Sequence, residues 1–320
     1  MSHEIDTTTG LPAIAYVGDE PWHGLGQKLL PGATIEEWTA AAGLNWGVDR
    51  AEVKFQIADA SMAMPSRNVL YRTDTHAPLS VVSDTYKVVQ PAQIMDFFRE
   101  VTTKTSAALE TAGSLFAGRV IWALARLGDD LRIKDDTIAP FLMLSTSYDM
   151  STPTITKLVA TRVVCNNTIQ MALNEQGKRQ IRIPHSTEFR ADEVRAGLEI
   201  SLDAFDVFKQ QALQLSNVQF LRTDMDRFLL KLLQPAVGEI DGDVIRKSKG
   251  YASIMNLFEG GQLGAEQDAS KNTAWGALNA VTQFIDHVKG RNQSSRLMDA
   301  WFSTGGKFKE RALELLTTTV

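Results

Sequence analysis

The segment EPWHGLG, residues 20–26, contains the residues best suited to chemistry near the start of the chain. His23 belongs to a residue type that binds metals, transfers protons and activates nucleophiles. A zinc site needs about three converging ligands, usually with two of them close in sequence. The five histidines, however, lie far apart. Pro21 fixes one backbone angle and the two glycines permit positive φ. We therefore predict a tight turn that buries Trp22, with ligand contact or catalysis by His23 as the alternatives.

Two pairs of aspartates are the next candidates, Asp224 with Asp226 and Asp241 with Asp243. Such pairs hold divalent cations in nucleases. On a helix, however, the first pair would point about 200° apart. The second pair flanks a glycine, where aspartates commonly bond to nearby backbone. We favour structural roles and predict no metal site, with a metal-dependent nuclease as an alternative.

Cys165 is the only cysteine, which excludes an intramolecular disulfide and any multi-cysteine metal site. We interpret it as a small buried residue, with a reactive thiol as the alternative. The segment STGGKFK, residues 303–309, lacks the first glycine and the spacing of a phosphate loop. No Gly-x-Ser-x-Gly nucleophile motif occurs. We predict no catalytic residue and no cofactor.

Positive charge is concentrated in two short regions, although the net charge is −5. An acidic protein can bind nucleic acid when its cations gather on one surface. The predicted DNA-binding residues are Lys157, Arg162, Lys178, Arg179, Arg182, Lys289, Arg291 and Arg296. Solvated faces with incidental charge are the alternative. Lys157 and Arg162 lie an odd number of residues apart, so an unbroken strand without a bulge points them to opposite faces. Trp301, Tyr148 and Tyr251 are candidate aromatics for base stacking.

In the first third of the chain, the helices and strands expected to position these residues follow no regular order. The sequence TIEEWTAAAG, residues 34–43, has a capping box and a terminal glycine, and predicts a helix. Strands are expected at 51–58 and 68–74, with a turn at 64–68. Pro91 suits the first turn of a helix.

The middle of the chain is rich in β-branched and aromatic residues. We expect three consecutive antiparallel strands at 114–128, 137–149 and 152–164. A short helix at 165–177 and an edge strand at 178–186 follow.

The last part is helical. Apolar residues at three- and four-residue steps predict a long helix over 194–215. Further helices are expected at 225–235, 272–290 and 295–316, and a mobile loop at 241–270. The predicted fold class is α+β: an antiparallel β-meander core with flanking helices and a helical C-terminal region. Residues 1–187 would form the α+β domain, and 188–320 a helical region packed on it or extending it.

Five stretches in order resemble one family: EPWHGLG, YKVVQP, TAGSLFAGRVIWALARL, TRVVCNNT and NTAWGALNAVTQFIDHVKG. The resemblance, over Tyr16 to Leu315, is to the phage/plasmid-like proteins of domain of unknown function 932. It implies a mobile-element setting and no established activity.

The favoured interpretation is a non-enzymatic mobile-element protein that binds or anneals single-stranded DNA in recombination or replication. We expect a homo-oligomer, with a ring as one form, by a fold-level analogy to annealing proteins. A counter-defence or regulatory factor that binds a host or phage protein is the alternative. No apolar run has the length of a membrane span and the N-terminus resembles no secretory signal, so we expect a cytoplasmic protein.

Overall fold

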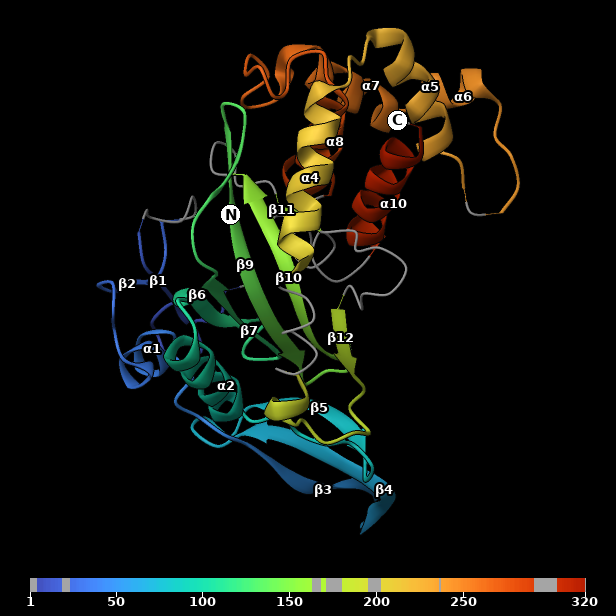
Figure 1. The fold of residues 1–320 in the computed structure, drawn as a ribbon. Coiled ribbons are helices and arrows are strands. Elements are labelled where there is room, and N and C mark those ends of the chain that lie inside the picture. The colour runs from blue at the N-terminus through green and yellow to red at the C-terminus, as the bar shows by residue number, and fades with distance from the viewer. Residues whose placement is uncertain are drawn as a thin grey trace.

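The computed structural model describes residues 5–18, 24–162, 168–170, 180–194, 203–235, 237–290 and 304–319. The chain has the predicted α+β fold, with antiparallel sheet and a helical C-terminal region (Figure 1). The strands are β1 (Ile14–Tyr16), β2 (Gln27–Lys28), β3 (Val48–Ile57), β4 (Ala60–Arg72), β5 (Pro78–Ser83), β6 (Ala108–Leu115), β7 (Val120–Arg126), β8 (Leu131–Ile133), β9 (Asp136–Ser147), β10 (Thr154–Arg162), β11 (Thr168–Gln170) and β12 (Gln180–Ile183). The helices are α1 (Ile35–Ala41), α2 (Pro91–Lys104), α4 (Asp203–Asn217), α5 (Arg222–Leu232), α6 (Gly242–Arg246), α7 (Lys249–Asn256), η1 (Leu257–Gly261), α8 (Ala274–Gln283), η2 (Phe284–Val288) and α10 (Thr304–Thr319).

The main sheet has the strand order β11-β10-β9-β7-β6-β1-β2, with β12 also beside β10 and β8 beside β9. The predicted run of three antiparallel strands is confirmed as β7, β9 and β10. The first of them was predicted too long, because the chain turns at Phe116–Gly118 and enters β7 from the separate strand β6. Both Phe116 and Ala117 have positive φ in this turn, a conformation that residues with side chains rarely adopt.

A second sheet, β3-β4-β5, contains a long hairpin. The predicted turn at residues 64–68 is wrong, because β4 runs through it and the chain reverses between Ile57 and Ala60 instead. Pro65 is tolerated because the β3–β4 pairing shifts register opposite Val53, and proline in sheets is found at such irregularities.

The helices form where local signals predict them, and one hydrophobic core joins them to the main sheet. The capping box of Thr34 and Glu37 begins α1, and Pro91 begins α2. Buried residues of α2 and of the C-terminal helices belong to the same core cluster, including Phe97, Phe208 and Trp275. This core therefore contains residues from both predicted regions, 1–187 and 188–320.

Residues 242–261 of the predicted loop are mainly helical, in α6, α7 and η1, and only residues 262–270 form turns; Asp241 and Ser248 cap the first two helices. Residues 168–170 form strand β11 rather than part of a helix, and the rest of the predicted helix at 165–177 lies outside the described residues. The helix predicted from residue 194 is described as α4 only from Asp203. Among the described residues, no helix is both long and apolar enough to cross a membrane.

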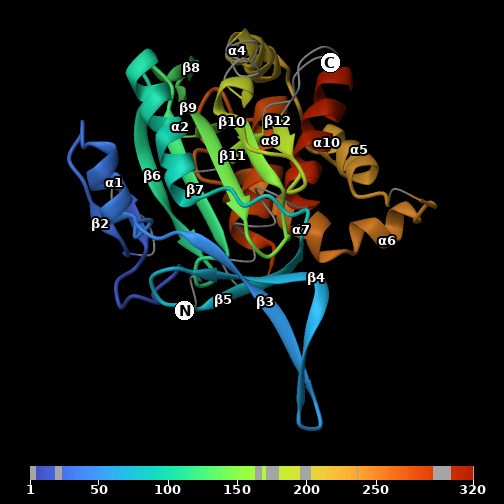
Figure 2. The ribbon, with the colours of Figure 1, turned by 90° about the horizontal axis from the view of Figure 1, so that it is seen from below.

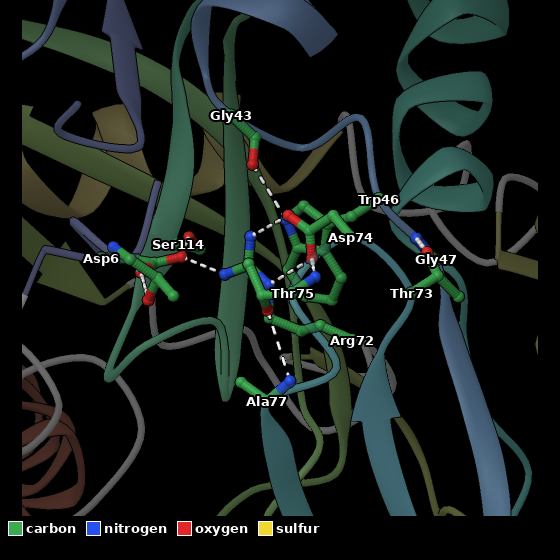
Figure 3. A network of polar contacts seen from close by, with 11 residues as sticks. Asp6, Gly43, Trp46, Gly47, Arg72, Thr73, Asp74, Thr75, Ala77 and Ser114 are labelled. Carbon is green, nitrogen blue, oxygen red and sulfur yellow. Dashed lines mark hydrogen bonds and ion pairs between the residues drawn. The ribbon is translucent and has the colours of Figure 1, made fainter. Parts of the chain in front are cut away.

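A buried polar network fixes the second sheet to the first (Figure 3). Arg72, at the end of β4, is 1% exposed and forms ion pairs with Asp6 and Asp74. Its guanidinium also lies 4.2 Å from the centre of the Trp46 ring. Asp6 in turn accepts a hydrogen bond from the hydroxyl of Ser114 on β6. The N-terminal segment, β4 and β6 are thereby joined around one cation.

Candidate nucleic-acid interface

An open groove of about 450 Å³ lies where the start of β3 meets the N-terminus of α2 and the segment after β12. Its lining includes Arg50, Lys87, Gln93, Glu188 and Phe189. The lining includes Val48, Asp49 and Arg50 at the start of β3, so the groove lies at the base of the β3–β4 hairpin, whose backbone is drawn in Figure 2. Proteins that bind single-stranded nucleic acids combine cations along the backbone with aromatic rings on which bases stack.

Gln90 fixes one wall of the groove. Its side-chain amide accepts a bond from the backbone N–H of Val48 at 2.9 Å and donates to the Val48 carbonyl at 2.8 Å. The side chain thus pairs with β3 as a neighbouring strand would. The backbone N–H of Gln90 donates to the amide oxygen of Gln93 at 2.8 Å. The start of β3 is therefore held against the start of α2.

The two cations of the groove come from β3 and from the segment before α2. Arg50 is half-buried and donates a hydrogen bond to the carbonyl of Tyr86. Lys87 is exposed, and its backbone N–H donates to the carbonyl of His185. The guanidinium is fixed in place, whereas the ammonium projects into solvent.

His185 anchors the segment that follows β12. Its ring stacks on Tyr86 with the centroids 4.5 Å apart, and its Nε2 lies 2.8 Å from the carbonyl oxygen of Thr152. Burial lowers the pKa of His185, so the imidazole is neutral at pH 7 and Nε2 carries the proton that bonds Thr152. This stack therefore holds residues 182–189 beside the groove, and the neutral imidazole adds no positive charge there.

The far end of the groove is mixed in character. Phe189 is half-buried and packs edge-on against Phe97 of α2, with the ring centroids 6.3 Å apart. Asp49 and Glu188 are exposed in the same lining, and Asp49 accepts a bond from Tyr71 at 3.1 Å. The two carboxylates offset the two cations. Phosphate attraction at this groove is therefore modest, and stacking on Phe189 would have to contribute.

Lys157 is not a surface residue, so its prediction as a DNA contact is corrected. It is 4% exposed on β10, in register with Met143. Burial above all, and then the nearby Lys309, lower the pKa of Lys157 to about 7. Lys309 itself is buried in an ion pair with Asp286 at 2.7 Å. This lysine belongs to the packing between the sheet and the last helices.

Of the other predicted DNA-binding residues, two are exposed at the surface and the rest have side chains outside the described residues. Arg182 is exposed on β12, and Lys289 is exposed just after η2. The β9–β10 pairing continues unbroken from Ile155 to Arg162, so the bulge that would bring residues 157 and 162 to one face is absent. Lys178, Arg179, Arg291 and Arg296 lie outside the described residues, as does the Arg162 side chain.

The proposed stacking aromatics also differ from expectation. Tyr148 is fully buried and donates its hydroxyl to the carbonyl of Val89, and burial raises its pKa well above the usual value. Tyr251 is half-buried and bonds Asp226 at 2.6 Å. The Tyr148 ring is therefore not a stacking surface, Tyr251 is half-buried like Phe189, and Trp301 lies outside the described residues.

The aspartate pairs are used in caps and ion pairs. Asp224 accepts the N–H of Leu221 at the start of α5, and Asp241 caps α6. Asp226 and Asp243 both bind Arg246, at 2.9 and 3.1 Å. Hydrogen bonds from Arg246 and then Tyr251 lower the pKa of Asp226 to about 2. In the described part of the chain, no three His, Cys, Asp or Glu residues converge as metal ligands.

The turn at EPWHGLG is described only in part. Gly24 and Gly26 have φ of 65° and 114°, as the turn prediction requires. A Cβ on Gly26 would lie 2.8 Å from the carbonyl oxygen of Ile14, so this glycine permits close approach to β1. Trp22, His23 and Cys165 lie outside the described residues.

Sequence reasoning missed the groove itself. Its residues come from positions 48–50, 87–93 and 188–189, which no local pattern connects. The one signal was YKVVQP, residues 86–91, which holds Lys87, Gln90 and the first residue of α2.

The structure defines an α+β protein with a large, mostly antiparallel sheet, a smaller sheet bearing a hairpin, and a polar groove beside the smaller sheet. The chain belongs to the family described as domain of unknown function (DUF932), whose model matches residues 78–301. That range is shorter than the resemblance over Tyr16 to Leu315 and leaves out β3 and β4. No curated protein and no solved structure matches the chain.

Proposed function

We propose that this protein binds single-stranded DNA and acts, without enzymatic activity, in annealing during recombination or replication of a mobile element such as a phage or plasmid. The setting would be the cytoplasm of a bacterial host. The observation that carries the proposal is the groove with Arg50, Lys87 and Phe189, which offers cations for phosphates and a ring for one base.

The segment after β12 extends this surface. Arg182 is exposed three residues before His185, whose carbonyl is bonded to Lys87. A strand lying along residues 182–189 would pass from Arg182 to the groove. It would meet about three cations, namely Arg182, Arg50 and Lys87. Lys157 is buried and adds none.

Charge reversal at Lys87 tests the proposal. The Lys87→Glu variant should lose about tenfold or more in affinity for a labelled single strand of about 50 nucleotides, since it removes one phosphate contact and adds repulsion. Lys271→Glu is the matched control, because Lys271 is also exposed and lies three residues before α8. Figure 1 shows α8 at the other end of the molecule from β3 and α2, which line the groove. Fluorescence anisotropy at fixed salt measures both affinities, and equal affinity for the two variants would contradict the site.

A further inference from the structure

The β3–β4 hairpin extends beyond the rest of the molecule (Figure 2). Residues 51–67, called the arm below, are all exposed except Val53, which is half-buried. A hairpin of two strands is at best marginally stable when isolated in water. The arm therefore lacks, in the single chain, the packing that would normally support it.

The two faces of the arm differ in chemistry. Phe55 pairs with Met62 and Ile57 with Ala60, so these four side chains share one face, because alternate residues of a strand point the same way. The opposite face carries Lys54 paired with Ala63, and Gln56 paired with Ser61. One face is thus wholly apolar at the tip and the other is mainly polar.

The apolar face is open to solvent. Exposed fractions are 43% for Phe55, 56% for Ile57 and 49% for Met62, with Met64 next along β4 at 44%. An apolar face left open on a projecting hairpin is a candidate interaction surface. Within the described part of the chain, the strands of the arm pair only with each other from Ala51 to Ser66, and Arg67 at its base pairs with Ser83 of β5. The outer edges of the arm beyond that pair therefore also offer unpaired backbone groups.

We propose that the apolar face of the arm docks on a second copy of this chain. Charge favours this occupant over a nucleic acid or a membrane. The only ionisable residues between 53 and 66 are Lys54 and Asp59, of opposite sign. Polybasic clusters attract anionic lipids and phosphates, and the arm has none. Two chains of net charge −5 meet least repulsion where such a neutral surface forms the contact.

The area of the arm indicates how the copies are arranged. Seven residues a strand at about 3.3 Å each, and two strands about 4.8 Å apart, give roughly 230 Å² on one face. One docked arm would bury about twice that area, because surface is removed from both partners. This is below the roughly 1,200 Å² of total surface that a small stable interface buries. Two arms in one interface would reach about 900 Å², so contact between the bodies would have to supply the rest. The proposed arrangement is therefore a reciprocal exchange across a two-fold axis, with each arm lying against the other chain, because it comes closer to the required area than one docked arm does.

Gel filtration with light scattering, without nucleic acid, tests this exchange. The wild-type chain, of 35.3 kDa, should elute as a dimer or a larger even-numbered assembly at about 50 μM. A Phe55→Glu/Met62→Glu variant should elute as a monomer, because it places four buried carboxylates in each dimer interface. The matched control is Gln56→Glu/Ser61→Glu, which adds the same charge to the opposite face of the arm and should remain associated.

Circular dichroism should show the same helical signal for both variants, since the arm contributes nothing to the core. Wild-type protein that is monomeric throughout a 5 to 200 μM series would overturn the proposal, as would equal dissociation of the two variants. Dissociation is measured without DNA, so its outcome is separate from the groove test. A monomeric wild type whose arm is instead protected by lipid vesicles or by another protein would also reject self-association.

Discussion

At the scale of single residues, Arg72 shows how one buried cation joins segments distant in sequence. It contacts Asp6, Asp74 and Trp46, and a Cβ on Gly118 would lie 2.8 Å from its Nη1. Burial alone would raise the pKa of Asp6, but hydrogen bonds from Thr8 and Arg72 hold it below its usual value. This carboxylate therefore stabilises the fold above its unfolded pKa of about 3.9, and that stability is lost as pH falls through the lower folded pKa.

Replacement of Arg72 should be costly. Arg72→Met leaves the Asp6 carboxylate, 2% exposed, without its cation, and we expect a loss of about 3 to 5 kcal/mol in the free energy of unfolding. Arg99→Met removes an exposed ion pair with Glu36 and should change stability far less. Urea denaturation compares the two, and a similar loss for both would contradict the role given to Arg72.

Because Lys157 is buried, we expect the free energy of unfolding to have an unusual dependence on pH. The pKa of Lys157 is about 7 in the fold, against about 10.4 unfolded. Between these values the unfolded chain holds a proton that the folded chain lacks, so this group makes stability rise with pH. Below pH 7 the group is charged in the folded chain as well, so its destabilising effect no longer grows as the pH falls further.

Lys157→Met should therefore stabilise the protein by about 1 to 4 kcal/mol at pH 6, and by much less near pH 10. Urea denaturation of the variant and the wild type at both pH values measures this difference. A stability difference that does not change with pH would show that Lys157 keeps an ordinary pKa.

At the scale of elements, close packing rather than propensity fixes the position of α8. A Cβ on Gly276 would lie 1.9 Å from the carbonyl oxygen of Ser270, so the helix approaches the preceding turn more closely than any other residue permits. Gly276→Ala should cost about 3 kcal/mol or more. Gly250→Ala in α7 is the control, because its nearest atoms lie 3.9 Å away, and it should be neutral or slightly stabilising. Thermal unfolding separates the two, and equal melting temperatures would contradict the tight approach.

The elements also show what local sequence can predict. The capping box at Thr34 and the proline at Pro91 act within one turn, and both helices begin where these signals place them. The turn at residues 64–68 was wrong, since Pro65 is accommodated by a register shift set across the hairpin. At the true reversal Ala58 has φ of 50°, a conformation that alanine rarely adopts, so the residue type at this position does not predict the turn.

At the scale of the whole molecule, surface and interior could not be separated from the sequence. Lys157 belongs to a basic cluster in the sequence but lies inside, because helices that follow more than a hundred residues later cover it. The groove joins three segments distant in sequence, and its cations were not among the predicted contacts. Only Arg182 and Lys289 are predicted contacts with side chains described at the surface.

The salt dependence of wild-type binding to a single strand of about 50 nucleotides tests the central claim most directly. On the proposed path, Arg50, Lys87 and Arg182 would give about three phosphate contacts for each bound chain. Single strands release about 0.7 counterions per contact, so the logarithm of affinity should fall by about 2 per tenfold rise in salt. Absent binding, or binding that does not respond to salt, would contradict the proposed function.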